Sequence, residues 1–382
     1  MDQAPTAPTV TTARARRNRV LASVAAAVVI VGAALGFGLT RSSSKPTSIS
    51  APSGSLASGL SFYANKTIKL IAPDAPGGGF DAVARAVAPY MASYLHATVD
   101  VTNDSSSDTL AGQDLFAASP ADGLTIGMLN AGTDIESIVT GTPGVNFNPK
   151  STQFLGGNPV AGGSGFECLA TSGFANFEQV VHSSTPVSEA VVSSGTQTLD
   201  LDLINAAFGI KTKIIGGYAN TAAEEQGEER GDGNCGVLSI STPGFGPYMA
   251  AGKANLLLQT HAADPKVAFY AQTTKAASLQ SEMTANPATT NSERLARAAL
   301  VQVTAVGVGH EFNAPANTPA AEVTALRAAL KYALQNPKCQ AVLLAAGQPT
   351  GWVSGTRASQ SYDDELAALR PVAPLIAGAL GL

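Results

Sequence analysis

The sequence lacks the short motifs of nucleotide-binding proteins and of the common hydrolases. The run 77–82 (GGGFDA) misses the final glycine of the dinucleotide fingerprint G-x-G-x-x-G. The only Gly-Lys pair, Gly252-Lys253, has Pro247 in place of the first P-loop glycine and Ala254 in place of the magnesium-binding Ser or Thr. Neither a G-x-S-x-G elbow nor an H-E-x-x-H helix occurs. We therefore assign no catalytic residue and expect a binding protein rather than an enzyme.

The sequence also contains few histidines and cysteines, the residues that most often bind metals or form disulfides. The four histidines are scattered without metal-ligand spacing, so we expect no metal site and no other cofactor. Three cysteines allow one disulfide in an exported domain and leave one cysteine over. Cys168 and Cys235 each lie in an apolar, strand-like run, whereas Cys339 reads as a small buried hydrophobe in an alanine-rich helix. The residues alone do not decide the pairing.

Basic residues are scarce beyond the N-terminus. Removing the six basic residues and one acidic residue of 1–60 from the chain's 23 and 28 leaves 17 basic and 27 acidic residues, a net charge of −10 for residues 61–382. Such a field argues strongly against nucleic acid as a partner, and we expect none. A small anionic ligand remains possible, because local backbone donors can overcome a diffuse unfavourable field.

Charge is absent altogether from residues 20–39 (VLASVAAAVVIVGAALGFGL). Twenty helical residues span about 30 Å, the thickness of a bilayer core. Four arginines in the basic segment 1–19 should stay cytoplasmic, so the C-terminal bulk should be exported. We favour a retained transmembrane anchor. The alternative is a signal that is cut nearby, which would give a secreted or periplasmic protein.

Residues 40–60 are rich in Ser, Pro and Gly, which predicts a flexible linker. From Ile68 onward, strand-like and helix-like segments alternate. Strands are expected at 68–71, 98–101, 125–129, 154–156, 166–170, 187–193, 213–215, 237–240 and 254–260, with helices between several of them. This alternation predicts parallel sheets covered by helices, an α/β fold.

The segment 68–81 (IKLIAPDAPGGGFD) is the most informative part of the chain. A strand runs into a glycine turn and then into a helix whose apolar residues recur every four positions. Glycines let the backbone approach a ligand, and the N–H groups of the first helical turn face it. The pattern favours an anion cradle built from backbone groups, although a glycine turn can also serve only to turn the chain.

Ligands of open parallel sheets bind outside the carboxyl ends of the strands. The loops expected there are 76–81, 130–134, 193–198 and 216–221. All four are rich in Gly, Ser, Thr and Asn, and none contains Lys, Arg or His. That composition suits a site that holds a carboxylate through hydrogen-bond donors and releases it.

Four segments in order resemble the extracytoplasmic receptors of the tripartite tricarboxylate transporters, the TctC/Bug family of solute-binding proteins. They are 75–81 (APGGGFD) followed by Ala84-Arg85, 119–127 (SPADGLTIG), 213–218 (KIIGGY) and 312–319 (FNAPANTP). The resemblance covers about residues 65–360. It implies a periplasmic-binding-protein-like fold of two α/β lobes with parallel-rich sheets, lobe 1 from 61–158 and 260–382 and lobe 2 from 159–259.

The resemblance also implies a function and a site. The receptor would be a monomer that captures a small organic carboxylate between its lobes and delivers it to the transporter's membrane subunits. One branch of the family carries cysteines that correspond to Cys168 and Cys235, which implies a disulfide between them. The expected ligand-binding residues are Pro76, Gly77, Gly78, Gly79, Asp81, Thr133, Ser193, Ser194, Gly195, Thr196, Tyr218, Asn220 and Thr221.

Several of these assignments have plainer alternatives. Asp81 could cap its helix as well as contact the ligand, Thr196 and Ser194 could be ordinary turn residues, and Tyr218 could pack at a strand end. Four glutamates at 224, 225, 228 and 229 are expected on a solvated helix face rather than at a metal. A membrane-tethered sensor that uses the same binding domain is the alternative function.

One loop departs from the family pattern. Residues 102–108 (TNDSSSD) stand where the family usually has N-x-P-G-A-G-G, so the loop has lost the glycines and the proline and has gained two aspartates. Added negative charge near the ligand would disfavour a highly charged tricarboxylate.

Overall fold

A computed structural model describes residues 55–104, 110–141, 148–159, 164–192, 196–218, 221–240, 245–260, 276–306 and 308–379. All of them belong to one compact unit, Ala51–Leu382. Within these ranges no helix has the length and apolar character needed to cross a membrane. The expected anchor at 20–39 and most of the linker at 40–60 lie outside the described residues, so both remain predictions.

The first sheet has the strand order β12-β4-β11-β3-β1-β2. Its strands β1, β2 and β3 are parallel, whereas β11 runs antiparallel to both β3 and β4. The sheet is therefore mixed rather than purely parallel. The bounds are β1 Thr67–Ala72, β2 Thr98–Asn103, β3 Thr125–Leu129, β4 Gln153–Pro159, β11 Val308–Ala314 and β12 Val353–Ser354.

The second sheet, of order β10-β9-β5-β8-β6-β7, repeats this plan. Its strands β6, β7 and β8 are parallel, and β5 runs antiparallel to both β8 and β9. The bounds are β5 Ser164–Leu169, β6 Val187–Val192, β7 Thr212–Tyr218, β8 Cys235–Ser239, β9 Ala254–Gln259 and β10 Ala277–Ser278.

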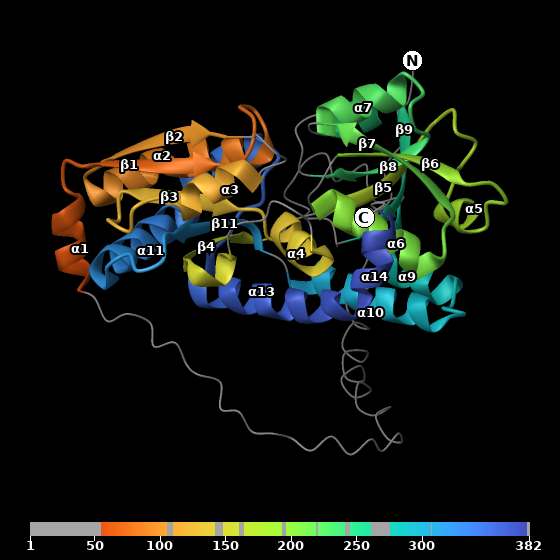
Figure 1. Cartoon of the computed structure of the whole chain (residues 1–382). Helices are drawn as coiled ribbons and strands as arrows, with labels where there is room; N and C mark the ends of the chain where they lie inside the picture. The colour runs from red at the N-terminus through yellow and green to blue at the C-terminus, as the bar shows by residue number, and fades with distance from the viewer. Residues whose placement is uncertain are drawn as a thin grey trace, which may run out of the picture. The chain divides into compact units, whose positions relative to one another are not determined.

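Helices connect the parallel strands in both halves, as Figure 1 shows for α2 and α3 beside β1 to β3 and for α6 and α7 beside β6 to β8. Each strand–helix junction therefore falls at the carboxyl edge of its sheet. The helices are α1 Leu56–Tyr63, α2 Gly79–Leu95, α3 Leu110–Ala117, α4 Ala131–Thr140, α5 Phe177–Val181, α6 Thr196–Phe208, α7 Thr221–Glu229, α8 Phe245–Ala250, α9 Leu279–Ala285, α10 Asn291–Val306, α11 Ala320–Gln335, α12 Pro337–Ala345, α13 Gly355–Leu369 and α14 Ala373–Ala379, with 3₁₀ turns η1 Pro149–Ser151 and η3 Arg370–Val372.

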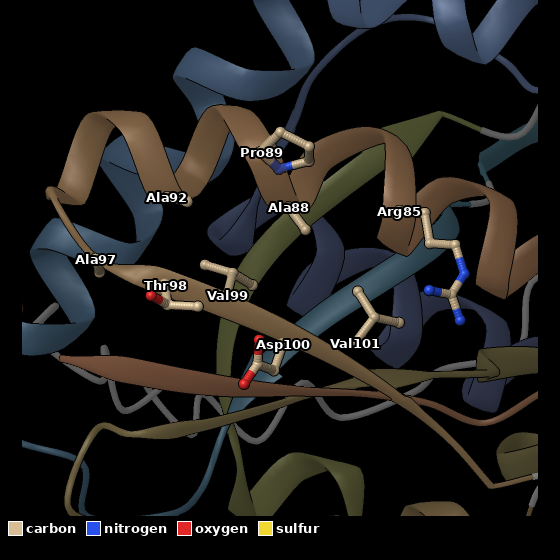
Figure 2. Close-up of a pocket in the computed structure, with 9 residues that line it drawn as sticks. All are labelled: Arg85, Ala88, Pro89, Ala92, Ala97, Thr98, Val99, Asp100 and Val101. Carbon is tan, nitrogen blue, oxygen red and sulfur yellow. The ribbon is translucent and has the colours of Figure 1, made fainter.

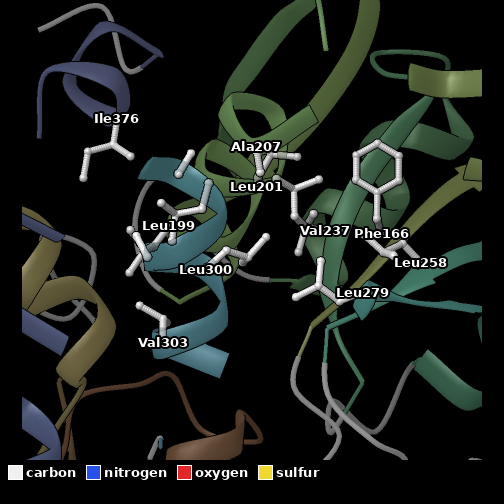
Figure 3. Packing of buried hydrophobic residues seen from close by; sticks show 14 of the residues in the cluster. Phe166, Leu199, Leu201, Ala207, Val237, Leu258, Leu279, Leu300, Val303 and Ile376 are labelled. Carbon is white, nitrogen blue, oxygen red and sulfur yellow. The ribbon is translucent and has the colours of Figure 1, made fainter. Parts of the chain in front are cut away.

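Residues after β9 add to the second sheet before the chain returns to the first sheet. Residues 260–382 were assigned to lobe 1, but β10 pairs with β9 of the second sheet. Helix α10 also packs there: Arg297 donates from Nε to the carbonyl of Ala207 at 2.8 Å, and Leu300 lies in a buried cluster with Phe166 and Val237 (Figure 3). The first sheet resumes only at β11. A two-residue strand such as β10 leaves almost no periodic signal in the sequence.

A disulfide joins Cys168 of β5 to Cys235 of β8, the pairing that the resemblance implied. The two residues are direct partners in the antiparallel register of these strands. Cys339 is a free, buried cysteine in α12, as expected from its apolar surroundings.

The acidic face expected on α7 is only partly solvated. Glu229 is exposed, but Glu224 and Glu228 are fully buried. They are four residues apart and pack over Gly236 of β8, where a Cβ would lie 2.6 Å from one carboxylate and 3.0 Å from the other. Tyr248 donates its hydroxyl to Glu228 at 2.9 Å. Burial, together with the nearby Glu228 carboxyl, raises the pKa of Glu167 in β5 well above its usual value.

Further buried carboxyls lie in the second half of the molecule, by which we mean the second sheet with its connecting helices; the first half is the first sheet with its helices. Burial raises the pKa of Glu189 in β6 to about 8, although Asn205 of α6 donates to its carboxylate at 2.7 Å. Burial likewise raises the pKa of Asp200 and of Asp202 in α6 to about 7. The folded state therefore favours the protonated form of these groups.

We predict that the protein loses stability as the pH rises from about 5 to 8. The pKa of Glu189 rises from 4.5 to about 8 on folding, so its contribution is fully present below pH 4.5 and is lost as the pH passes through 8. Melting temperatures at pH 5, 6, 7 and 8 should fall steadily, and Glu189→Gln should flatten the fall. The exposed Glu178→Gln is the matched control and should keep the wild-type slope. Equal slopes for Glu189→Gln and the wild type would contradict the assignment.

Candidate functional site

The loop between β1 and α2 has the predicted geometry of a strand, a glycine turn and a helix N-terminus. Gly77 adopts a φ of +90°, which favours glycine, and Gly78 is the N-cap of α2 but has no side chain to cap it. A Cβ at Gly78 would overlap the carboxylate of Asp74. Gly78 is therefore required because an acidic side chain already occupies the space beside it.

Asp74 supplies the cap that Gly78 cannot. Its Oδ1 accepts from the backbone N–H of Ala75 at 2.8 Å, and its Oδ2 accepts from that of Phe80 at 3.3 Å. The side chain is half-buried, and burial raises the pKa of its carboxyl, with the charge of Asp81 acting in the same direction. The expected cradle of backbone donors thus contains an acidic side chain that the sequence reading missed.

Asp81 braces the same loop from the first turn of α2. Its Oδ2 accepts from Gly77 N–H at 2.9 Å, and its Oδ1 accepts from Asn103 Nδ2 at 2.9 Å. Arg85 Nε lies 2.8 Å from Oδ1, one turn along the helix. Although burial opposes it, these hydrogen bonds and the Arg85 charge lower the pKa of Asp81. The contacts agree with the capping alternative for this residue.

Asn103, the last residue of β2, ties the two neighbouring strands together at this edge. Besides its bond to Asp81, its Nδ2 donates to the carbonyl of Asp74 at 3.0 Å, and its Oδ1 accepts from Arg85 Nη2 at 2.9 Å. The loop is therefore held by side chains from β2 and α2 as well as by its own backbone.

A buried histidine lies under the glycine turn. His310 of β11 is 8% exposed, and its ring packs edge-on against Phe80 with centroids 4.6 Å apart. A Cβ added at Gly79 would lie 3.6 Å from Nε2 of His310 and equally far from Nε2 of Gln348. Burial lowers the pKa of His310 to about 4, so the ring is neutral near pH 7.

The asparagine beside His310 fixes the protonation of its ring. Asn158 of β4 donates from Nδ2 to the carbonyl of Pro349 at 3.3 Å, and its Oδ1 accepts from the backbone N–H of His310 at 3.1 Å. The same Oδ1 lies 3.1 Å from Nδ1 of the ring. Because an amide oxygen can only accept, Nδ1 carries the proton and Nε2 presents a lone pair.

The third loop of this edge, between β3 and α4, has its polar side chains inside. Asn130 caps α4 by accepting from Thr133 N–H at 3.4 Å. Thr133, an expected ligand residue, is 1% exposed, and Asp134 is buried equally deeply. Desolvation raises the pKa of Asp134 well above its ordinary range. In this structure Thr133 belongs to the packed interior.

In the second half, the expected loops begin the corresponding helices. Thr196 is the first residue of α6 and Thr221 the first of α7, as a strand–turn–helix reading requires. Tyr218 ends β7; its hydroxyl donates to Asp232 at 3.0 Å, and its ring packs against Gly227 of α7. These contacts agree with the strand-end packing alternative. Ser193, Ser194, Gly195 and Asn220 lie outside the described residues.

A groove of 710 Å³ lies between α2 and the edge strand β2. Figure 2 shows Pro89 and Arg85 of α2 facing Val99 and Val101 of β2 across it. β2 is an edge strand, so its outer side has no partner strand in the sheet as described. Of the groove's lining residues, only Arg85 also contacts the braced loop, through Asp81 and Asn103.

Comparison with known proteins gives matches among solved structures, and these support the fold. No family model matches the chain, and no curated protein matches it. Solved structures do match: MatC of Rhodopseudomonas palustris with bound malate has a TM-score of 0.61 at 18% identity, covering 81% of this chain and 99% of MatC. A second R. palustris protein, with adipate, gives 0.62 at 18%, covering 81% and 97%. The periplasmic binding protein BugD gives 0.59 at 19%, covering 84% and 98%.

The fold is that of periplasmic solute-binding proteins. A TctC solute-binding protein from Polaromonas also matches, with a TM-score of 0.57 at 15% identity over 81% of this chain and 99% of that one. The match extends over nearly the whole of each of these structures, so both sheets take part in it. The resemblance first read from four short segments therefore holds at the level of the fold.

We predict that Gly78→Ala destabilises the protein by about 1–3 kcal/mol, because the new Cβ would expel the Asp74 carboxylate and leave the Phe80 N–H without its acceptor. Denaturant unfolding measures the loss. Gly79→Ala is the control, since the nearest atoms to its Cβ lie at an ordinary 3.6 Å. In an Asp74→Ala background the cost of Gly78→Ala should shrink. Strict additivity of the two changes would show that they do not interact.

Proposed function

We propose that this chain is an extracytoplasmic receptor that captures a small organic carboxylate for a tripartite tricarboxylate-type transporter. One observation carries the proposal. The chain forms two sheets, each with strand–helix junctions at its carboxyl edge, in a fold shared with solute-binding proteins. Two of those proteins hold malate and adipate, which are dicarboxylates. A solute-binding role also accounts for a chain without recognisable catalytic motifs.

In the first half, the ligand would meet the start of α2. The N–H groups of Gly79 and Asp81 lie in the first helical turn, where no acceptor exists within the helix, and they favour a negative group. From the second half, residues 193–198 and 219–221 would supply the opposing donors. A ligand that touches both halves selects the closed population, because only that form makes both sets of contacts.

The N-terminal segment would keep the receptor at the membrane. Four arginines precede twenty uncharged residues, and the linker 40–60 would give the binding domain reach. Export would also allow the Cys168–Cys235 disulfide to form. A receptor tethered in this way would deliver its ligand to membrane subunits of the transporter without leaving the surface.

Ligand-induced stabilisation tests the receptor function. Full-length protein is melted with a panel of mono-, di- and tricarboxylates and amino acids. A ligand at 100 times its dissociation constant should add about 2.7 kcal/mol of stability. We expect a selective rise with one class of acid, and sulfate at equal ionic strength is the control. A flat response from folded protein to every acid would contradict the receptor function.

Alkaline carbonate extraction tests the proposed anchor. A protein retained by a membrane-spanning segment should stay in the membrane pellet, whereas a chain without residues 1–60 should be released to the supernatant. Mass spectrometry of the mature N-terminus provides the second measurement. A mature chain that begins after residue 39 would show that the segment is a cleaved signal.

A further inference from the structure

We propose that Asp74 is the counter-ion for a cationic group of the ligand, so that the receptor takes a zwitterionic acid, an amino acid, in preference to a plain carboxylic acid. This inference rests on the proposed receptor function and narrows its ligand class. It follows from how charge and hydrogen-bond capacity are distributed around the glycine turn.

Asp74 is the uncompensated charge of the first loop. Its two hydrogen bonds come from backbone N–H groups, of Ala75 and Phe80, and no basic side chain among the described residues pairs with it. The second carboxylate, Asp81, is in contrast paired with Arg85 and accepts from Asn103. Two carboxylates and one guanidinium leave the loop with a net charge of −1.

The carboxylates also use the donors that an anionic ligand would need. Asp74 takes the N–H groups of Ala75 and Phe80, and Asp81 takes that of Gly77. A plain carboxylate approaching the glycine turn would therefore meet a negative charge and few remaining donors. A ligand that carries an ammonium group beside its carboxylate meets an acceptor for the first and the Gly79 and Asp81 N–H groups for the second.

An independent acceptor points at the same loop. His310 is more than nine-tenths buried, and the bond from its Nδ1 to Asn158 leaves the Nε2 lone pair facing Gly79. The hydrogen bonds found for His310 within the described part of the chain involve its backbone N–H and Nδ1, so Nε2 is open to a donor from a ligand. Both Asp74 and His310 therefore favour a ligand that donates hydrogen bonds.

Matched pairs of acids test the inference in full-length protein. Each pair shares a carbon skeleton and differs by one ammonium group: succinate and L-aspartate, glutarate and L-glutamate, adipate and L-2-aminoadipate, 4-methylpentanoate and L-leucine, 3-phenylpropionate and L-phenylalanine. Calorimetric titration gives the dissociation constant of each. We expect the amino member of the best-bound pair to bind at least tenfold more tightly.

The variant Asp74→Asn assigns that preference to one carboxylate. It keeps an acceptor oxygen but removes the charge, so the ratio within the best pair should fall to about threefold or less. Asp100→Asn is the matched control: Asp100 is an exposed aspartate of β2 that lines the groove between α2 and β2, and the ratio should stay as in the wild type. Circular dichroism confirms that both variants are folded.

The outcomes separate the two claims. If plain acids bind as tightly as their amino partners, or if Asp74→Asn leaves the ratio unchanged, the counter-ion role is wrong while the receptor function stands. If neither member of any pair binds to folded protein while another acid of the wider panel does, the amino-acid preference is wrong and the receptor function stands; if no acid of the panel binds, both fail. If the amino acids bind more tightly than their plain partners, and this preference disappears in Asp74→Asn but not in Asp100→Asn, the counter-ion role and the receptor function are both supported.

Discussion

The backbone donors at the end of β1 constrain this half of the molecule more than any other group. A chain that leaves a buried strand and starts a helix exposes N–H groups that must find acceptors. Here two aspartates from the loop itself provide them, and this arrangement requires glycine at position 78 and places Asn103 and Arg85 around Asp81. The neighbouring strands β1 and β2 are joined through these contacts, so the loop is a braced part of the sheet edge.

Both sheets of this chain place equivalent strand–helix junctions at one edge, although the sequence shows no repeat. The parallel trios β2-β1-β3 and β7-β6-β8 each border an antiparallel strand. The two antiparallel strands come from different places in the chain: β5 precedes its trio and β11 follows a long excursion through the second half. The same architecture is thus reached by two different chain paths, which hides the likeness from any search for a repeated segment.

The sequence was sufficient where local rules determine structure. The glycine turn and helix start of 77–95, and the alternation of strands and helices, follow from residue types and periodicity. It was insufficient where a distant residue decides. Glu224 and Glu228 look like surface residues until Gly236 leaves room for them, and Asp74 looks like a turn residue until Gly78 is seen beside it. His310 sits in a buried strand, and the sequence of that strand does not show which way the ring points. Part of the expected second-half site, at 193–195 and 220, stays a prediction.

The disulfide has a mechanical consequence for the acidic interior of the second half. It closes β5 on β8 at Cys168 and Cys235, one position away from the pair Glu167 and Gly236. Because successive strand residues point to opposite faces, the sulfur bridge and the carboxyls lie on opposite sides of the same two strands. The strands cannot part to relieve repulsion among the acids. The buried carboxyls of α7 are therefore held against a fixed pair of strands, and α7 starts at one of the loops expected to meet the ligand.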